Sequence, residues 1–129
     1  SNVISINGGV QLDLMGQENA ESALTRQLSG IGGQMDFLEG AFRSRGGKGF
    51  ICINSSRVTK DGERRSNIVA AILSGSTVSA PRTMIDCVAT EYGVARLMGK
   101  SLRERAEAMA SIAHPDFREE LLKYAREHF

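Results

Sequence analysis

The sequence predicts one α/β layered domain in which a mixed central sheet is flanked by helices. Short apolar runs typical of buried strands alternate along the chain with segments whose apolar residues recur at helical spacing. The length of 129 residues and the 41% share of hydrophobic residues also suit one domain with its own core. We therefore treat residues 1–129 as a single domain.

The chain opens with two predicted strands in residues 3–14. Apolar and polar residues alternate on both sides of Asn7-Gly8-Gly9. Two alternating runs joined by such a turn are typical of a β-hairpin. The polar stretch of residues 16–30 shows no clear period, and we interpret it as a loop with one short helical turn.

A helix is predicted to begin at Gln34, directly after a pair of glycines. Met35, Leu38 and Phe42 then fall at helical spacing. The run Phe50-Ile51-Cys52-Ile53 is apolar without alternation, which predicts a strand covered on both faces. Three further short strands are expected in residues 66–73, 76–81 and 85–93.

Two helices are predicted to end the chain. Ser101 followed by Glu104 forms a capping box, which predicts a helix that begins just after Ser101. His114 is expected to cap the next helix, and Pro115 suits its first position. The sheet strands therefore precede a helical C-terminal quarter.

Composition and charge exclude several classes of function. Sixteen basic and fifteen acidic residues give a net charge of +1, which argues against nucleic acid as the main partner. No apolar run approaches the ~20 residues that a membrane span requires. No Cys/His cluster has zinc spacing, so no metal is expected. Cys52 and Cys87 lie in apolar runs and are expected to be buried thiols of a cytoplasmic protein.

Glycines concentrate between Ser29 and Phe50, where seven of the fourteen in the chain occur. Glycine lets backbone amides approach a ligand, and a helix that begins after Gly32-Gly33 would add its positive end. This pattern predicts a backbone cradle for an oxyanion, a phosphate or a thioester carbonyl. Basic residues flank the central strand and either form a solvated face or hold phosphates: Arg43, Arg45, Lys48, Arg57, Lys60, Arg64 and Arg65.

Two other patterns have a structural explanation as well as a functional one. Gly99-Lys100-Ser101 resembles the end of a phosphate-binding loop, but its glycine spacing is wrong and helix capping explains it better. Glu91 ends a predicted strand and is a candidate nucleophile. The alternative, an ion pair with one of the arginines of residues 96–105, is the interpretation that we favour.

Three blocks carry a resemblance to a known family: "GIGGQMDF" (30–37), "GGKGFICINSS" (46–56) and "TEYGVARLMGKSLRERAEAMASIAHPDFREEL" (90–121). Together they resemble the C-terminal domain of the acetyl-CoA hydrolase/transferase family, which includes 4-hydroxybutyrate, succinate and acetate CoA-transferases. The resemblance runs from about residue 3 to about residue 123 and implies a NagB/RpiA/CoA-transferase-like fold.

The resemblance also implies an activity that needs more than this chain. Members of the family have two similar α/β domains and move CoA between an acyl-CoA and a small carboxylic acid through a glutamyl-CoA thioester. Their nucleophilic glutamate would lie upstream of residue 1, so Glu91 would not be the nucleophile and this chain would be inactive alone. CoA is then a substrate, no cofactor is permanently bound, and the partners are the N-terminal domain and a second copy in a homodimer.

The resemblance points to a few site residues. The amide of Gly33, beside Gly32, would donate to the thioester carbonyl. CoA contacts would fall at Val10, at Ser29, where the family often has asparagine, and at Lys60, the lysine nearest to the family's position. Two alternatives remain open: an acyl-CoA hydrolase, and a non-catalytic module that binds CoA or a nucleotide.

Overall fold

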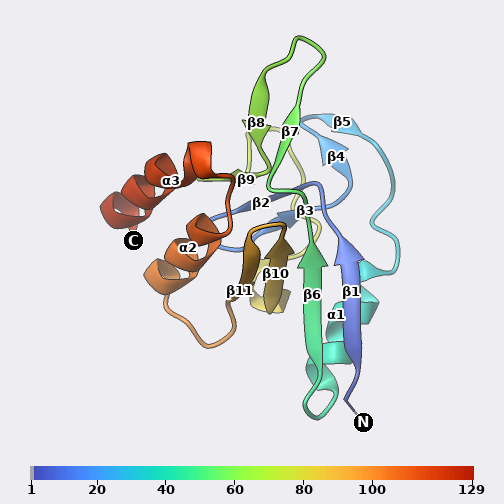
Figure 1. Ribbon diagram of the computed structural model, residues 1–129. Coiled ribbons are helices and arrows are strands. Elements are labelled where there is room, and N and C mark those ends of the chain that lie inside the picture. Colours follow the sequence, from blue (N-terminus) through green and yellow to red (C-terminus); the bar gives the residue numbers. More distant parts are fainter. Residues whose placement is uncertain (1) are drawn as a thin grey trace.

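The computed structural model describes residues 2–129, and its centre is a four-stranded sheet with the order β1-β6-β10-β11 (Figure 1). These strands are β1 (Ile4–Gly8), β6 (Lys48–Cys52), β10 (Cys87–Thr90) and β11 (Gly93–Arg96). The first three run parallel, and β11 is antiparallel to β10. The predicted mixed sheet of an α/β domain is thus confirmed.

Helix α1 (Gln34–Arg43) begins at the residue that its periodicity predicts, and it packs against β1 and β6. Leu38 points to the sheet so closely that a β-carbon on Gly49 would lie 3.1 Å from Leu38 Cδ2. The first turn of α1 lies near Gly9, the residue that follows β1, because Glu18 contacts both segments. The helix therefore starts at the end of the sheet where β1 and β6 finish.

Smaller strands and turns lie beyond this end of the central sheet (Figure 1). A three-stranded sheet has the order β3-β2-β9, built from β2 (Gln11–Asp13), β3 (Glu18–Asn19) and β9 (Ile68–Val69). Two hairpins accompany it, β4 (Ser22–Ala23) with β5 (Arg26–Gln27) and β7 (Ser56–Val58) with β8 (Arg64–Ser66). A 3-10 turn, η1 (Arg82–Met84), precedes β10.

Helices α2 (Leu102–Ser111) and α3 (Pro115–His128) begin where the sequence predicts. The Ser101 hydroxyl accepts from the Glu104 amide at 3.2 Å, and the Ser101 amide donates to Glu104 Oε1 at 3.3 Å. His114 Nδ1 accepts from the Asp116 amide at 3.2 Å. The core lies between the helices and one face of the sheet, and its fully buried members include Leu12, Leu14, Ile51, Ile68, Val88, Leu97 and Met109.

The predicted hairpin at Asn7-Gly8-Gly9 is wrong. β1 pairs with β6, whereas β2 pairs with β3 and β9. At Gly9 the chain leaves one sheet and enters the other, since Gly9 N–H donates to Cys52 O and Val10 N–H to Asn19 O. The alternating pattern identified two strands correctly, but partners far along the chain decided their pairing.

Three other expectations about secondary structure, one of a loop and two of strands, need correction. Residues 16–30 form β3, β4 and β5 and no helical turn. Residues 76–81 make only an isolated bridge, between Ala80 and Glu18. The last predicted strand is two, because Gly93 begins β11 at a φ of +144° instead of ending β10. Short strands with two paired residues carry too little periodicity to be seen in a sequence.

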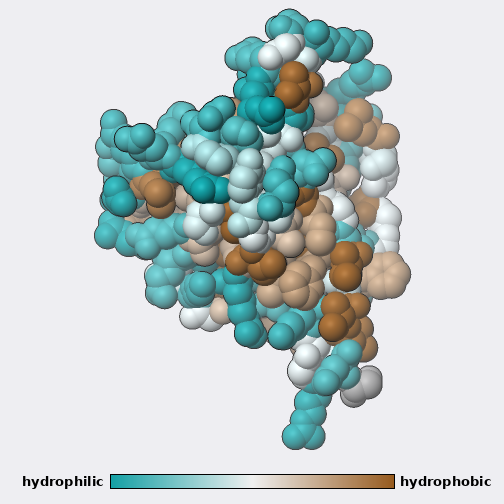
Figure 2. Space-filling view, in the orientation of Figure 1, coloured by the Kyte–Doolittle hydropathy of each residue, from teal (hydrophilic) through white to brown (hydrophobic). Residues whose placement is uncertain are grey.

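The expectation that β6 is covered on both faces is also wrong. The helices cover one face of the central sheet, on which Ser5, Gly49, Ile51, Val88 and Ala95 are buried. On the opposite face Ile4, Ile6 and Val94 are 60%, 69% and 60% exposed. Figure 2 shows hydrophobic side chains gathered over β1 and β6 there. We call this surface, made of Ile4, Ile6, Phe50, Cys52 and Val94, the bare sheet face.

The two cysteines differ in exposure, contrary to expectation. Cys87 is buried, but Cys52 is exposed on the bare sheet face. Burial raises the pKa of the Cys87 thiol, and the neighbouring Asp86 carboxylate adds to this. Among residues 2–129 no helix has the length and apolar character needed to cross a membrane.

Candidate functional site

The carboxyl ends of β1, β6 and β10 meet at one edge of the sheet, next to the first turn of α1. In open α/β sheets ligands bind outside the carboxyl ends of parallel strands. Gly9, Ile53 and Glu91 leave the sheet at this edge. Three of the seven glycines of the segment that the sequence singled out, Gly30, Gly32 and Gly33, also lie here, in the linker from β5 to α1.

Gly33 is the N-cap of α1 and is exposed. The first amides of a helix have no partner within it, and within residues 2–129 no side chain caps this end. These amides and the helix dipole favour negative charge on a ligand. The start of α1 can therefore stabilise an oxyanion chemically.

Gly32 and Gly33 differ in what they require of the backbone. Gly32 has a φ of +63°, a left-handed conformation that favours glycine. Gly33 has a φ of −95° and a ψ of 10°, which other residues adopt. A β-carbon on Gly33 would meet only the Phe37 ring, at an ordinary 3.5 Å. Neither the backbone nor packing within the described residues thus explains glycine at position 33.

Val10 and Ser29 lie in the two linkers that border this edge. The Val10 amide donates to Asn19 O at 2.9 Å, and its side chain lines a cavity of about 400 Å³ together with Leu24 and Leu73. Ser29 is exposed, and its amide donates to Glu21 O at 3.2 Å.

Lys60 lies apart from the glycine-rich segment, at the exposed tip of the β7–β8 hairpin. The tip is closed by the Thr59 amide, which donates to Glu63 O at 2.8 Å. Arg57 donates to Asn67 Oδ1 at 2.6 Å, and Arg65 pairs with Glu63 at 3.1 Å. The hairpin thus carries four of the seven basic residues predicted to flank the central strand, Arg57, Lys60, Arg64 and Arg65, whereas Arg43 ends α1 and Lys48 begins β6. No contact joins Lys60 to Gly33 in the part of the chain that the structure describes.

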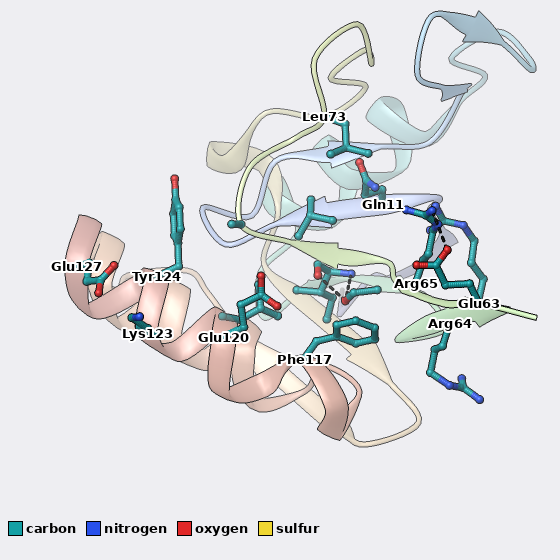
Figure 3. Close-up of a pocket in the computed structure, with 16 residues that line it drawn as sticks. Gln11, Glu63, Arg64, Arg65, Leu73, Phe117, Glu120, Lys123, Tyr124 and Glu127 are labelled. Carbon is teal, nitrogen blue, oxygen red and sulfur yellow. Dashed lines mark hydrogen bonds and ion pairs between the residues drawn. The ribbon is translucent and has the colours of Figure 1, made fainter. Parts of the chain in front are cut away.

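A groove lies between this hairpin and α3 (Figure 3). It has a volume of about 500 Å³. Phe117 and Tyr124 of α3 contribute its apolar side, while Arg64 and Arg65 of β8 lie across from them. The described lining of this groove omits every predicted contact residue, but it shares Gln11, Arg57 and Leu73 with the cavity beside Val10.

Glu18 is a residue of this region that the sequence did not indicate. Its side chain is fully buried, and burial raises the pKa of its carboxyl to about 7, although a hydrogen bond from Gln34 opposes the shift. Gln34 Nε2 donates to Glu18 Oε2 at 2.8 Å. Oε1 has no hydrogen-bond partner within residues 2–129. Nothing in a polar stretch without periodicity marks one glutamate as buried, so this residue had no detectable signal.

Glu91 holds the strand ends together and makes no ion pair with the arginines of residues 96–105, so that expectation is wrong for the described chain. Its Oε1 accepts the Ser55 amide at 2.8 Å, and this bond holds the pKa of the carboxyl below its ordinary value. An exposed, ionised carboxylate that links β10 to the segment after β6 has a structural role. Residues 2–129 contain no group of three or more His, Cys, Asp or Glu side chains that could hold a metal.

Comparison with known proteins found relatives that match nearly the whole length of this chain. The profile of the acetyl-CoA hydrolase/transferase C-terminal domain matches residues 1–125. A butyryl-CoA:acetate CoA-transferase of Anaerostipes caccae is 48% identical over 124 residues, 96% of this chain and 28% of the relative. A 4-hydroxybutyrate coenzyme A transferase of Clostridium kluyveri is 48% identical over 128 residues, 99% of this chain and 29% of the relative.

A solved structure shows the same fold. RipA from Yersinia pestis superposes with a TM-score of 0.83 at 40% identity, over 97% of this chain and 27% of that one. The chain thus spans a little more than a quarter of the length of the relatives that it matches.

Proposed function

Because this chain belongs to the acetyl-CoA hydrolase/transferase family, we propose that it is the C-terminal domain of a CoA-transferase and supplies an oxyanion-stabilising amide and CoA contacts. The longer enzyme moves CoA from an acyl-CoA to a small carboxylic acid. Its nucleophilic glutamate, which forms the glutamyl-CoA thioester, lies outside residues 1–129.

The observation that carries this proposal is the geometry of Gly33. It begins α1 with no side-chain cap in the described chain, and its backbone conformation does not need glycine. A ligand that must approach the amide explains why a β-carbon is absent there. The glycines that the fold does require, such as Gly32 with its positive φ, shape the turn that brings this amide forward.

The chemistry proposed for the amide is charge stabilisation. When a carboxylate attacks the thioester carbon, the carbonyl oxygen gains negative charge, and it loses this charge when the CoA thiolate leaves. An amide at ~2.7–3.1 Å from that oxygen stabilises the charge, by ~3 kcal/mol per donor in other enzymes. The positive end of the α1 dipole acts in the same direction.

Gly33→Ala in the full-length enzyme tests the proposal. The added methyl group keeps acyl oxygen and amide apart, so we expect kcat to fall about 10²-fold while the melting temperature stays unchanged. Gly40→Ala in the same helix is the control, since open space surrounds Gly40. It should keep kcat and gain up to ~1 kcal/mol of stability. A Gly33→Ala enzyme with normal kcat would contradict the oxyanion role.

The rest of the enzyme is the partner proposed for the bare sheet face. Parallel sheets in soluble proteins are covered on both faces, and β1 is an edge strand with Ile4 and Ile6 exposed. Apolar residues of α1 are exposed too, with Phe37 at 63% and Phe42 at 61%. A layer from the remaining three quarters of the enzyme covers such surfaces, and the completed enzyme pairs as a homodimer.

Two alternative activities are distinguished by the acceptor. A transferase consumes an acyl-CoA only in the presence of an acceptor carboxylic acid and forms the acyl-CoA of that acid, whereas a hydrolase releases free CoA with water alone. A non-catalytic module binds CoA without turnover. Assays of the full-length enzyme with and without acetate separate the three. This chain alone is expected to be inactive, and turnover that Glu91→Gln abolishes would contradict the assignment of the nucleophile.

A further inference from the structure

We propose that Glu18 is a positioning residue of the CoA site, whose buried carboxyl ties the Gly9–Val10 linker to Gln34 and so fixes the Gly33 amide. This inference rests on the proposed function and deepens it. Glu18 touches no reacting atom, because its side chain is fully buried. Its influence passes through the two segments that it contacts.

The first contact is with α1. Gln34 is the first residue of the helix and its side chain is buried. Its side-chain amide, Nε2, donates to Glu18 Oε2 at 2.8 Å. A side chain held at this position fixes the direction of the first helical turn. Gly33 is the adjoining residue, so the orientation of its amide depends on this bond.

The second contact is with the linker between the two sheets. A β-carbon on Gly9 would lie 2.6 Å from Glu18 Oε2 and 3.2 Å from Ile51 Cγ2. Gly9 is therefore glycine because the carboxyl and β6 come so close. Val10, a predicted CoA contact, follows directly and is fixed by its bond to Asn19, the neighbour of Glu18.

The backbone of Glu18 is itself immobilised, so the carboxyl has a fixed origin. Its amide donates to Ala80 O at 3.0 Å, and its carbonyl accepts the Ser79 amide at 2.7 Å. It also pairs with Leu12 of β2. Because the backbone of Glu18 cannot shift, its carboxyl holds Gln34 and Gly9 at fixed positions.

Among residues 2–129, no charged group compensates the charge of this carboxylate. Its neighbours from α1, the linker, β6 and the segment before η1 are Gln34, Gly9, Ile51 and Ser79–Ala80, none of which titrates. The nearest acids in the chain are bound elsewhere, Asp13 by Gln17 and Glu21 by Ser79 and Gln27. The Arg105 guanidinium donates to the carbonyls of Met15, Leu97 and Arg82.

The charge state of Glu18 then affects catalysis. An ionised carboxylate beside the start of α1 opposes negative charge on the acyl oxygen, whereas a neutral carboxyl does not. Both forms accept the Gln34 hydrogen bond. The kcat of the wild-type enzyme should therefore fall as the pH rises through neutrality, whereas the kcat of Glu18→Gln, which carries no charge at position 18, should not.

The test uses the full-length enzyme with Glu18→Gln, Glu18→Ala, and Asp86→Asn as control. Asp86 is a largely buried carboxyl at the opposite end of the sheet. We expect the kcat ratio of Glu18→Gln to wild type to rise at least about threefold between pH 6 and pH 8.5, on the scale of one nearby charge. The same ratio for Asp86→Asn should stay constant. A constant ratio for Glu18→Gln would overturn the effect of charge.

A second measurement tests positioning without any activity. Exchange of the Phe37 amide, which donates to Gly33 O at the start of α1, should accelerate about tenfold or more in Glu18→Ala and not in Glu18→Gln, which keeps an acceptor for Gln34. Unchanged exchange in Glu18→Ala would overturn the positioning role. If exchange accelerates in Glu18→Ala but the wild-type enzyme turns over no acyl-CoA, the proposed function fails while the structural role of Glu18 remains.

Discussion

Glu18 makes the stability of the protein depend on pH at the scale of one residue. The pKa of its carboxyl is raised from 4.5 to about 7 in the folded state because burial disfavours the charged form. The folded state therefore holds the proton more tightly than the unfolded state does. The resulting stabilisation is complete below pH 4.5 and is lost as the pH rises through 7.

Glu18→Gln should remove this loss. Relative to its stability at pH 5, the wild-type enzyme should lose up to about 3 kcal/mol by pH 8 that the variant retains. Urea titrations of both proteins at the two pH values measure the difference. Parallel behaviour of the two proteins would show that the carboxyl does not titrate in this range.

The site was only partly predictable from single residues. Gly33 could be identified because a glycine pair before a helical period has a local signal, and the role that we propose for it came from family resemblance. Its negative φ and the space around it, which should let alanine replace it without strain, are properties of the fold that the sequence did not reveal. The burial of Glu18 could not be predicted from the sequence, because burial depends on the neighbours that pack around a residue. Here those neighbours come from distant segments.

At the scale of elements, local signals predicted well and pairing did not. The capping box at Ser101 and the proline at the start of α3 act within a few residues, and both helices begin as expected. The glycine pair at Gly8-Gly9 also looked local, but the partner of β1 is β6. Strand pairing depends on packing with distant segments, which one stretch of sequence does not contain.

The β7–β8 hairpin is the element expected to contact the phosphates of CoA. Lys60 at its exposed tip should contribute to affinity through charge, so Lys60→Ala in the full-length enzyme should weaken CoA binding about two- to fivefold at low salt. The difference should shrink at high ionic strength because exposed charges are screened. Equal affinities of the two proteins at low salt would remove Lys60 from the site. Titration calorimetry at two salt concentrations gives the comparison.

At the scale of the whole molecule, we expect the remainder of the proposed enzyme to cover the bare sheet face. Ile6 is 69% exposed, so a charge at this position would be harmless if the face were solvated. If the rest of the enzyme covers it, Ile6→Asp buries an unpaired carboxylate and should destabilise the full-length enzyme by more than about 2 kcal/mol.

Val58→Asp is the matched control for this experiment. Val58 is 57% exposed on the β7–β8 hairpin, away from the bare sheet face. Thermal or urea unfolding of both variants measures the effect, and Val58→Asp should stay within about 0.5 kcal/mol of wild type. Two equally mild variants would mean that water covers the face in the complete enzyme.

The crossing of the chain between two sheets at Gly9 also constrains the order of folding. β1 reaches its partner β6 only after four short strands and α1, and β6 reaches β10 after another long excursion. Such distant parallel pairings form slowly, because loop-closure entropy is lost before the new contacts compensate. We expect α2 and α3, which are built from contacts near in sequence, to be ordered before β1 is in place. Pulse-labelled refolding should protect their amides first, and early protection of β1 would contradict this order.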